Sequence, residues 1–220
     1  MKTIKTTIYF ADIRRLAPFE RELAFLLWPE RREKMRRFRR DEDRLRCLAG
    51  GLFIEGIAQG RRITYNQNGK PFLPGGPWFS LSHSGNFACI ALSAASPVGI
   101  DLEIRREENL DTLARTAFHP VELAFYLKKP SPERFFDIWT AKESYVKMLG
   151  TGFSVETSLF CILPENMTLL AGGGKHPCFL RFNRLEGYSL TLCTAEPADV
   201  HITEAFFNPK EGVPVLPPRS

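Results

Sequence analysis

The sequence predicts an α+β chain organised in two halves that join near residues 95–105. Strand-like and helix-like patterns follow in the order strand, helices, strands, and then helices and strands once more. Apolar side chains recur at helical spacing over 41–59 and 133–149, and they alternate at strand spacing over 98–104. We expect a functional site between the halves, because ligand sites favour such junctions.

The elements of the first half follow from local patterns and turn signals. The strand patterns lie at 3–10, 78–82 and 87–93. The helix patterns lie at 19–28 and 41–59. Pro29 favours a break or a helix start, and Asn68-Gly69 favours a turn. The Ser-Gly-Asn turn at 84–86 predicts a hairpin between the last two strands.

The second half begins with the strand over 98–104 and continues through helices into β-structure. The helix patterns lie at 108–117, 120–128 and 133–149. The later strand patterns lie at 158–163, 177–183, 187–194 and 201–207. These patterns divide the chain into an N-terminal half over 1–98 and a C-terminal half over 99–220.

The composition is that of a globular protein with a sizeable core. The chain has 220 residues, of which 44% are hydrophobic and 25% are charged. No apolar stretch approaches the roughly 20 residues that cross a bilayer. The N-terminal residues carry charges where a signal peptide has its apolar core, so we expect a cytoplasmic protein without a membrane role. Five scattered cysteines without a CxxC pair favour buried thiols.

The charge is concentrated in one segment. Residues 31–40 hold seven Lys or Arg and one Glu, and the rest of the chain has 23 basic and 24 acidic residues. A nearly neutral protein with one basic patch suits a polyanion or a small ligand with several phosphates. The alternative is a solvated helix face, which is the commoner outcome for a charge run.

The segment G-I-D-L-E-I at 99–104 places two carboxylates on one strand face. Asp101 and Glu103 point away from the apolar side chains of their strand, with Cα atoms about 7 Å apart. Two carboxylates held together repel unless a cation lies between them, and Mg²⁺ prefers carboxylates and substrate phosphates. An ordinary strand with two solvated acids is the alternative.

The segment W-T-A-K-E-S-Y-V-K at 139–147 places an acid and a base on one helix face. Trp139, Glu143 and Lys147 recur every four residues. Glu143 is a candidate metal ligand or general base, and Lys147 is a candidate phosphate contact. By itself this segment favours an ordinary surface pair, which contributes only about 0.3 kcal/mol.

The segment S-L-S-H-S-G at 80–85 places polar groups where a strand meets a tight turn. His83 lies there between Ser82 and Ser84, whose hydroxyls are candidate contacts for phosphate oxygens. A lone histidine is more often structural. A Ser–His nucleophile is disfavoured, because no G-x-S-x-G motif surrounds either serine.

Taken together and in order, five segments resemble the larger, Sfp-type class of 4′-phosphopantetheinyl transferases. They are P-E-R-R-E-K-M-R-R-F at 29–38, G-K-P at 69–71, S-L-S-H-S at 80–84, G-I-D-L-E at 99–103 and W-T-A-K-E-S-Y-V-K at 139–147. The resemblance implies two similar α+β halves forming a pseudo-dimer, with coenzyme A bound between them. It implies Mg²⁺-dependent transfer of the 4′-phosphopantetheine arm to a serine of an apo acyl or peptidyl carrier protein, releasing adenosine 3′,5′-bisphosphate.

The resemblance also implies roles for individual residues. The expected Mg²⁺ ligands are Asp101, Glu103 and Glu143. The expected catalytic residues are Glu143, Lys147 and His83. Glu143 is also the expected base, and Lys147 is expected to contact the phosphates and assist the leaving group. The expected contacts of the 3′-phosphate are His83, Arg31, Lys34 and Arg46. Lys70 and Ser82 are expected along the adenine and the diphosphate.

Two other functions stay open at this stage. A nucleic-acid-binding module would use the basic segment but leaves the acids unexplained, and we expect no nucleic-acid partner. A metal-dependent hydrolase would use the same acids but needs no carrier. The two-half architecture favours a monomer, and we expect an apolar surface near residues 110–130 that docks the carrier.

Overall fold

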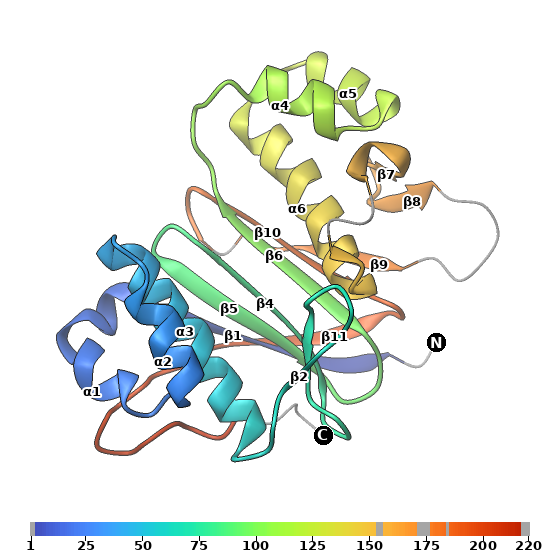
Figure 1. Ribbon diagram of the computed structural model, residues 1–220. Coiled ribbons are helices and arrows are strands. Elements are labelled where there is room, and N and C mark those ends of the chain that lie inside the picture. Colours follow the sequence, from blue (N-terminus) through green and yellow to red (C-terminus); the bar gives the residue numbers. More distant parts are fainter. Residues whose placement is uncertain (1–2, 153–155, 171–176, 184, 217–220) are drawn as a thin grey trace.

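The computed structural model describes residues 3–152, 156–170, 177–183 and 185–216 and shows a mixed α+β fold (Figure 1). The helices are α1 (Glu20–Ala24), α2 (Pro29–Arg36), α3 (Asp41–Ala58), α4 (Leu110–Ala117), α5 (Pro120–Leu127) and α6 (Pro132–Leu149). The strands are β1 (Ile4–Asp12), β2 (Thr64–Tyr65), β3 (Pro71–Phe72), β4 (Trp78–Ser84), β5 (Phe87–Ser93), β6 (Val98–Ile104), β7 (Cys161–Leu163), β8 (Thr168–Leu170), β9 (Cys178–Arg181), β10 (Tyr188–Thr194) and β11 (Ala198–Glu204). The predicted 87–93 and 98–104 strands are confirmed residue for residue.

Three predicted elements differ from the structure. The 19–28 helix is reduced to α1, because Pro29 already begins α2. The predicted 158–163 strand overlaps a 3-10 turn at Thr157–Leu159, and within it only β7 pairs as a strand. The 201–207 strand is shifted, because pairing with β1 begins at Ala198 and ends at Glu204.

Two sheets form the centre of the molecule. The first has the strand order β11-β1-β5-β4, and the second has the order β6-β10-β9. β11 pairs with β1 in parallel, and the other pairs in these sheets are antiparallel. The β4–β5 hairpin is confirmed, with Ser84 opposite Phe87. β4 and β6 are therefore the edge strands at which the two sheets meet.

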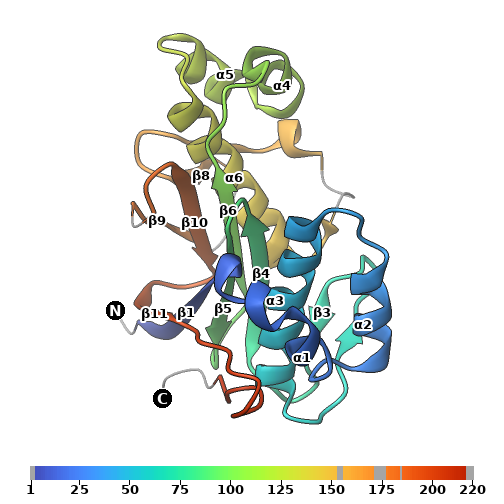
Figure 2. The same ribbon diagram turned by 90° about the vertical axis from the view of Figure 1, so that its left-hand side faces the viewer.

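Alternating side chains build the layers. On β5, Ile90 and Leu92 pack in a core with α1–α3, whereas Cys89 and Ala91 pack between the two sheets. On β6, Ile100 and Leu102 join that second core. Helices α1–α3 cover one face of the first sheet, and α6 lies along β6 and β10 (Figures 1 and 2). The face of β6 that bears its acids therefore points toward α6.

Clear local signals define both ends of α6. Ser131 caps its N-terminus by accepting a hydrogen bond from the Arg134 N–H at 3.2 Å, and Pro132 occupies the first turn. Gly150 ends the helix in the left-handed conformation with φ 70°. The helix that bears Glu143 and Lys147 therefore has defined limits.

The last strand of the chain, β11, returns across the predicted division at residue 98. That boundary coincides with the start of β6. However, β11 returns to the first sheet, and Phe207 and Leu216 pack in the core of the first sheet and α1–α3. The C-terminal segment from β11 onward thus belongs spatially with the N-terminal half.

The helices give no sign of a transmembrane segment. Within the ranges that the structure describes, none combines the length and the apolar character that crossing a bilayer requires.

Candidate active site

A glycine brings the catalytic candidates on β6 and α6 together. A Cβ added to Gly99 would collide with the backbone of Ser144 and Met148 on α6. Glycine at this position therefore permits the close approach of helix and strand. The i, i+4 spacing of Glu143 and Lys147 then directs both side chains toward the acidic face of β6.

Asp101 is the most deeply buried acid of the group, at 3% exposure. Its Oδ1 accepts hydrogen bonds from Lys147 Nζ at 2.6 Å and from Ser82 Oγ at 2.9 Å. Its Oδ2 is buried and has no hydrogen-bond partner among the described residues. A buried carboxylate oxygen without a partner is costly, so this atom is available for a ligand.

Glu103 and Glu143 extend the acidic cluster. Both side chains are half-buried, and Ser84 Oγ donates to Glu103 Oε2 at 2.6 Å. Burial, followed by the charge of Asp101, raises the pKa of Glu103 above its usual value. Burial and the charges of Asp101 and Glu103 likewise raise the pKa of Glu143. The charge of Asp101 therefore opposes the ionisation of Glu103 and Glu143, and a bound cation would relieve this repulsion.

Lys147 supplies the positive charge inside this cluster. Its ammonium donates to Asp101 and also to Ser82 Oγ at 3.0 Å. Burial alone would lower the pKa of Lys147, but the ion pair and hydrogen bond with Asp101 outweigh it and raise that pKa. Lys147 is therefore a charged donor next to the acids, and not one half of a Glu143–Lys147 surface pair.

The donor set fits a hard cation in its chemistry but is not arranged around one. Carboxylate oxygens are the ligands that Mg²⁺ prefers, and Asp101 Oδ2 has no hydrogen-bond partner among the described residues that would compete with such an ion. In the described part of the chain, however, no three His, Cys, Asp or Glu side chains are grouped closely enough to hold an ion. Lys147 occupies the other oxygen of Asp101.

His83 and Arg46 lie on the other side of β4 from the acids. The imidazole of His83 is exposed, and Arg46 Nη1 donates to the Gly85 carbonyl at 2.7 Å in the turn that follows. Arg46 also pairs with Asp43 at 2.6 Å. Partial loss of hydration, followed by the positive charge of Lys147, lowers the pKa of His83. His83 thus lies in a positive field that would favour an anionic ligand.

The remaining basic candidates lie on α2, which packs against α3. The Arg31 guanidinium donates to Tyr65 Oη at 3.1 Å, and Lys34 is exposed. Burial raises the pKa of the Cys47 thiol on α3, and the charges of Lys34 and Arg31 partly oppose this rise. Both charges therefore lie near α3. The predicted basic patch therefore follows the surface that α2 and α3 share.

Lys70 contacts α6 directly. Its ammonium donates to the carbonyls of Lys147 at 2.6 Å and Met148 at 3.2 Å, at the C-terminal end of α6. Burial lowers the pKa of Lys70 to about 8. A cation at a helix C-terminus satisfies carbonyls that lack partners within the helix. The β2–β3 hairpin thus anchors the helix that bears Lys147.

A buried ion pair that the sequence did not predict lies on another side of α6. Lys142 Nζ donates to Glu122 Oε2 at 2.6 Å, and the two side chains are 1% and 0% exposed. Glu122 also accepts from the N–H groups of His119 at 2.9 Å and Ile162 at 2.7 Å. This pair joins α5, α6 and β7. No sequence signal identified it, because its two residues lie in separate helices.

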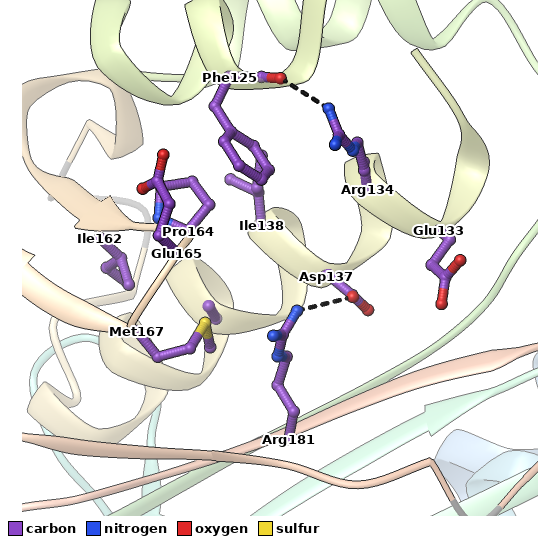
Figure 3. A pocket seen from close by; sticks show the side chains of 11 residues that line it. Phe125, Glu133, Arg134, Asp137, Ile138, Ile162, Pro164, Glu165, Met167 and Arg181 are labelled. Atoms are coloured by element: carbon purple, nitrogen blue, oxygen red, sulfur yellow. Dashed lines mark hydrogen bonds and ion pairs between the residues drawn. The ribbon is translucent and has the colours of Figure 1, made fainter. Parts of the chain in front are cut away.

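A cavity of about 350 Å³ is lined by none of the acids of the cluster formed by Asp101, Glu103 and Glu143 (Figure 3). Phe125, Ile138 and Met167 line it together with charged side chains at its edge, among which Arg181 pairs with Asp137 at 2.9 Å. None of the site residues predicted from the sequence lines this cavity. The candidate site is therefore the acidic cluster at the junction of β4, β6 and α6.

Comparison with known proteins agrees with the predicted resemblance. A family model described as "4′-phosphopantetheinyl transferase superfamily" matches residues 97–193. The chain is 32% identical over 185 residues to a 4′-phosphopantetheinyl transferase of Bacillus subtilis, covering 76% of this chain and 82% of that protein. It is 29% identical over 195 residues to 4′-phosphopantetheinyl transferase Sfp of Bacillus subtilis strain 168, covering 81% and 86%. It is 36% identical over 158 residues to 4′-phosphopantetheinyl transferase AcpT of Salmonella typhi, covering 68% and 76%.

Proposed function

Because this chain belongs to the 4′-phosphopantetheinyl transferase superfamily and is an enzyme of that kind, we propose that it uses coenzyme A to modify an apo carrier protein. The 4′-phosphopantetheine arm moves to a carrier serine, and adenosine 3′,5′-bisphosphate leaves. The observation that supports this most directly is the ammonium of Lys147 bound to Asp101 and Ser82 beside Glu103 and Glu143. Phosphoryl transfer depends on such positioned charges.

In the proposed reaction, Glu143 and Lys147 act on opposite sides of the reacting phosphorus. The carboxylate of Glu143 takes the proton of the carrier serine as the new oxygen–phosphorus bond forms. The bond from that phosphorus to the oxygen of the leaving adenosine bisphosphate breaks. Lys147 donates to the phosphate oxygens and neutralises the charge that gathers on the leaving group.

The proposed Mg²⁺ ligands are Asp101, Glu103 and Glu143, and the unpartnered Asp101 Oδ2 supports the first of them. When bound, the ion would neutralise the charge of the diphosphate and polarise the phosphorus under attack. In its absence Lys147 is the counter-ion of Asp101.

Coenzyme A recognition is proposed to use the positive surface around β4, α2 and α3. His83, Arg31, Lys34 and Arg46 are the proposed contacts of its 3′-phosphate. Burial, followed by the charge of Lys147, lowers the pKa of His83, so positive charge lies near this side chain. Lys70 and Ser82 stay predicted contacts of the adenine and the diphosphate. Both side chains are bonded to protein groups here, so contact with coenzyme A requires a change of partners.

The carrier protein is proposed to dock on α4 and α5. Leu113, Val121 and Leu127 are exposed on these helices at 43%, 42% and 37%, within the segment where the sequence predicts an apolar surface. An amphipathic helix of the carrier would bury them.

The two halves are proposed to form a pseudo-dimer. Each has an 18-residue helix, α3 or α6, and three strands in corresponding order, β1-β5-β4 and β6-β10-β9. The 1–98 and 99–220 division, a monomeric state and a cytoplasmic location stay predictions.

Intact-protein mass spectrometry of an apo carrier incubated with this enzyme, coenzyme A and Mg²⁺ tests the proposal. We expect the carrier to gain the mass of one phosphopantetheine unit, and a chelator to prevent the gain. Release of phosphopantetheine to water without a gain on any carrier would favour the hydrolase. Tight, steeply salt-dependent binding of nucleic acid without coenzyme A binding would favour the nucleic-acid module.

A further inference from the structure

Serine side chains join the two sheets where β4 meets β6. The two strands are edges of different sheets, so their main chains are not neighbours in a ladder within the described residues. Instead, Ser80, Ser82 and Ser84 on β4 present their hydroxyls to β6. Each hydroxyl accepts a hydrogen bond of 3.1 Å, from the N–H groups of Ile100, Leu102 and Ile104 respectively. The three serines form one row because strand side chains repeat every second residue.

The row has a second regular feature. A serine hydroxyl that accepts a bond still has a proton to donate. Ser82 donates to Asp101 at 2.9 Å, and Ser84 donates to Glu103 at 2.6 Å. In each case the acceptor directly precedes the residue whose N–H the serine accepts. For Ser80 the corresponding position is Gly99, which has no side chain.

We infer that Ser84 is a positioning residue that orients Glu103 for a divalent cation. Its hydroxyl is held by the Ile104 N–H and is nearly enclosed, at 9% exposure for the residue. Ser84 therefore fixes the position of Glu103 Oε2 beside β4 and leaves the other carboxylate oxygen for a ligand. Hydrogen-bond partners of metal-binding carboxylates commonly change metal affinity 10–100-fold when removed. The inference rests on the proposed function insofar as Glu103 is a metal ligand.

Ser80 provides a matched control within the same strand. Ser80→Ala removes one hydroxyl bond between β4 and β6, and Ser84→Ala removes the equivalent bond together with the bond to Glu103. Both variants should lose the stability of one bond between the strands, and the second also loses that of the bond to Glu103. Only the second should change cation binding.

The experiment measures binding of Mn²⁺, as a paramagnetic probe for Mg²⁺, to the full chain with coenzyme A and without a carrier. We expect Ser84→Ala to weaken binding about tenfold or more, Ser80→Ala to leave it within about twofold, and Ser84→Thr to restore it. If Ser84→Ala does not fold, Ser84→Cys keeps the volume with a much weaker donor and should show the same loss. Thermal unfolding of each variant supplies the comparison of stability.

Equal Mn²⁺ affinities for the Ser84→Ala and Ser80→Ala variants, whether both are weakened or both are unchanged, would overturn the inference. So would absence of Mn²⁺ binding by the parent chain. The carrier assay separates this failure from failure of the proposed function. If the parent enzyme modifies a carrier and the Ser84→Ala variant binds Mn²⁺ normally, only the role of Ser84 is refuted. If Mn²⁺ binding depends on Ser84 but the parent modifies no carrier, only the proposed function is refuted.

Discussion

Replacing Glu122 by glutamine should destabilise the chain by about 3–5 kcal/mol, because the change leaves a buried ammonium without its counter-ion. Lys142 is 1% exposed, and its remaining partner would be the Phe160 carbonyl at 2.6 Å. Lys142→Met should cost a similar amount, about 3–5 kcal/mol, since it strands the carboxylate instead. The N–H groups of His119 and Ile162 still bond that carboxylate and place this variant at the lower end of the range.

The double variant separates the ion pair from the packing around it. Glu122→Gln with Lys142→Met removes both charges and keeps both side-chain volumes nearly unchanged. Replacing a buried pair by neutral groups of similar size is often close to neutral, so we expect a loss of about 1–2 kcal/mol. The sum of the two single-variant losses would then greatly exceed the loss in the double variant, as expected for residues in direct contact.

Equilibrium urea unfolding, followed by circular dichroism, measures these differences. A loss of 3–5 kcal/mol in a chain of this size lowers Tm by about 6–20 °C, so thermal scans give a second check. Single variants within about 1 kcal/mol of the parent, or a double variant equal to the sum of the two, would refute the reasoning. The same variants, assayed below their unfolding range, report whether anchoring α6 to α5 and β7 also affects turnover.

Three further perturbations probe the site and the first half. Lys147→Ala should lower kcat about 100-fold while weakening coenzyme A binding much less, as rapid-quench kinetics and calorimetry would show, and a loss confined to affinity would contradict a role in the transition state. Gly99→Ala should destabilise the chain by about 1–3 kcal/mol and reduce turnover, because its Cβ meets the backbone of α6. Gly50→Ala, whose Cβ would meet nothing within 4 Å, should instead be neutral or slightly stabilising, and equal effects of the two alanines in urea unfolding would contradict this account. Glu55→Gln should stabilise the chain at pH 7 but not near pH 4. Burial raises the pKa of Glu55, so the stability that its protonated carboxyl contributes is lost as pH rises from the usual glutamate pKa through the raised one. The amide oxygen of the glutamine can still accept a hydrogen bond from the Trp28 N–H. Parallel unfolding curves at the two pH values test this sign.

Periodicity predicted the elements that build the site. The strand over 98–104 and the helix beginning near 133 are long, regular patterns with clear capping or turn residues, and both formed as expected. The prediction that Asp101 and Glu103 share a face of β6 is consistent with their partners on β4. Where the local pattern was weak, as over 158–163 and 201–207, pairing with other strands determined the limits.

Partners distant in the sequence could not be predicted in the same way. Lys147 was expected at the phosphates or paired with Glu143, and its ion pair with Asp101 joins residues 46 positions apart. Lys70 reaches the end of α6 across 77 positions. The hydroxyls of Ser82 and Ser84 were predicted as candidate phosphate contacts, and in the structure they bond to β6.

Residue type and spacing along the chain predicted most of the longer elements, the shared face of Asp101 and Glu103, and the family. Which faces of these elements meet depends on three-dimensional packing. The close approach of α6 to Gly99, the serine row between β4 and β6 and the buried Glu122–Lys142 pair arise from packing between segments distant in sequence. Burial then raises the pKa values of Glu103 and Glu143, since desolvation has no counterpart in the extended chain.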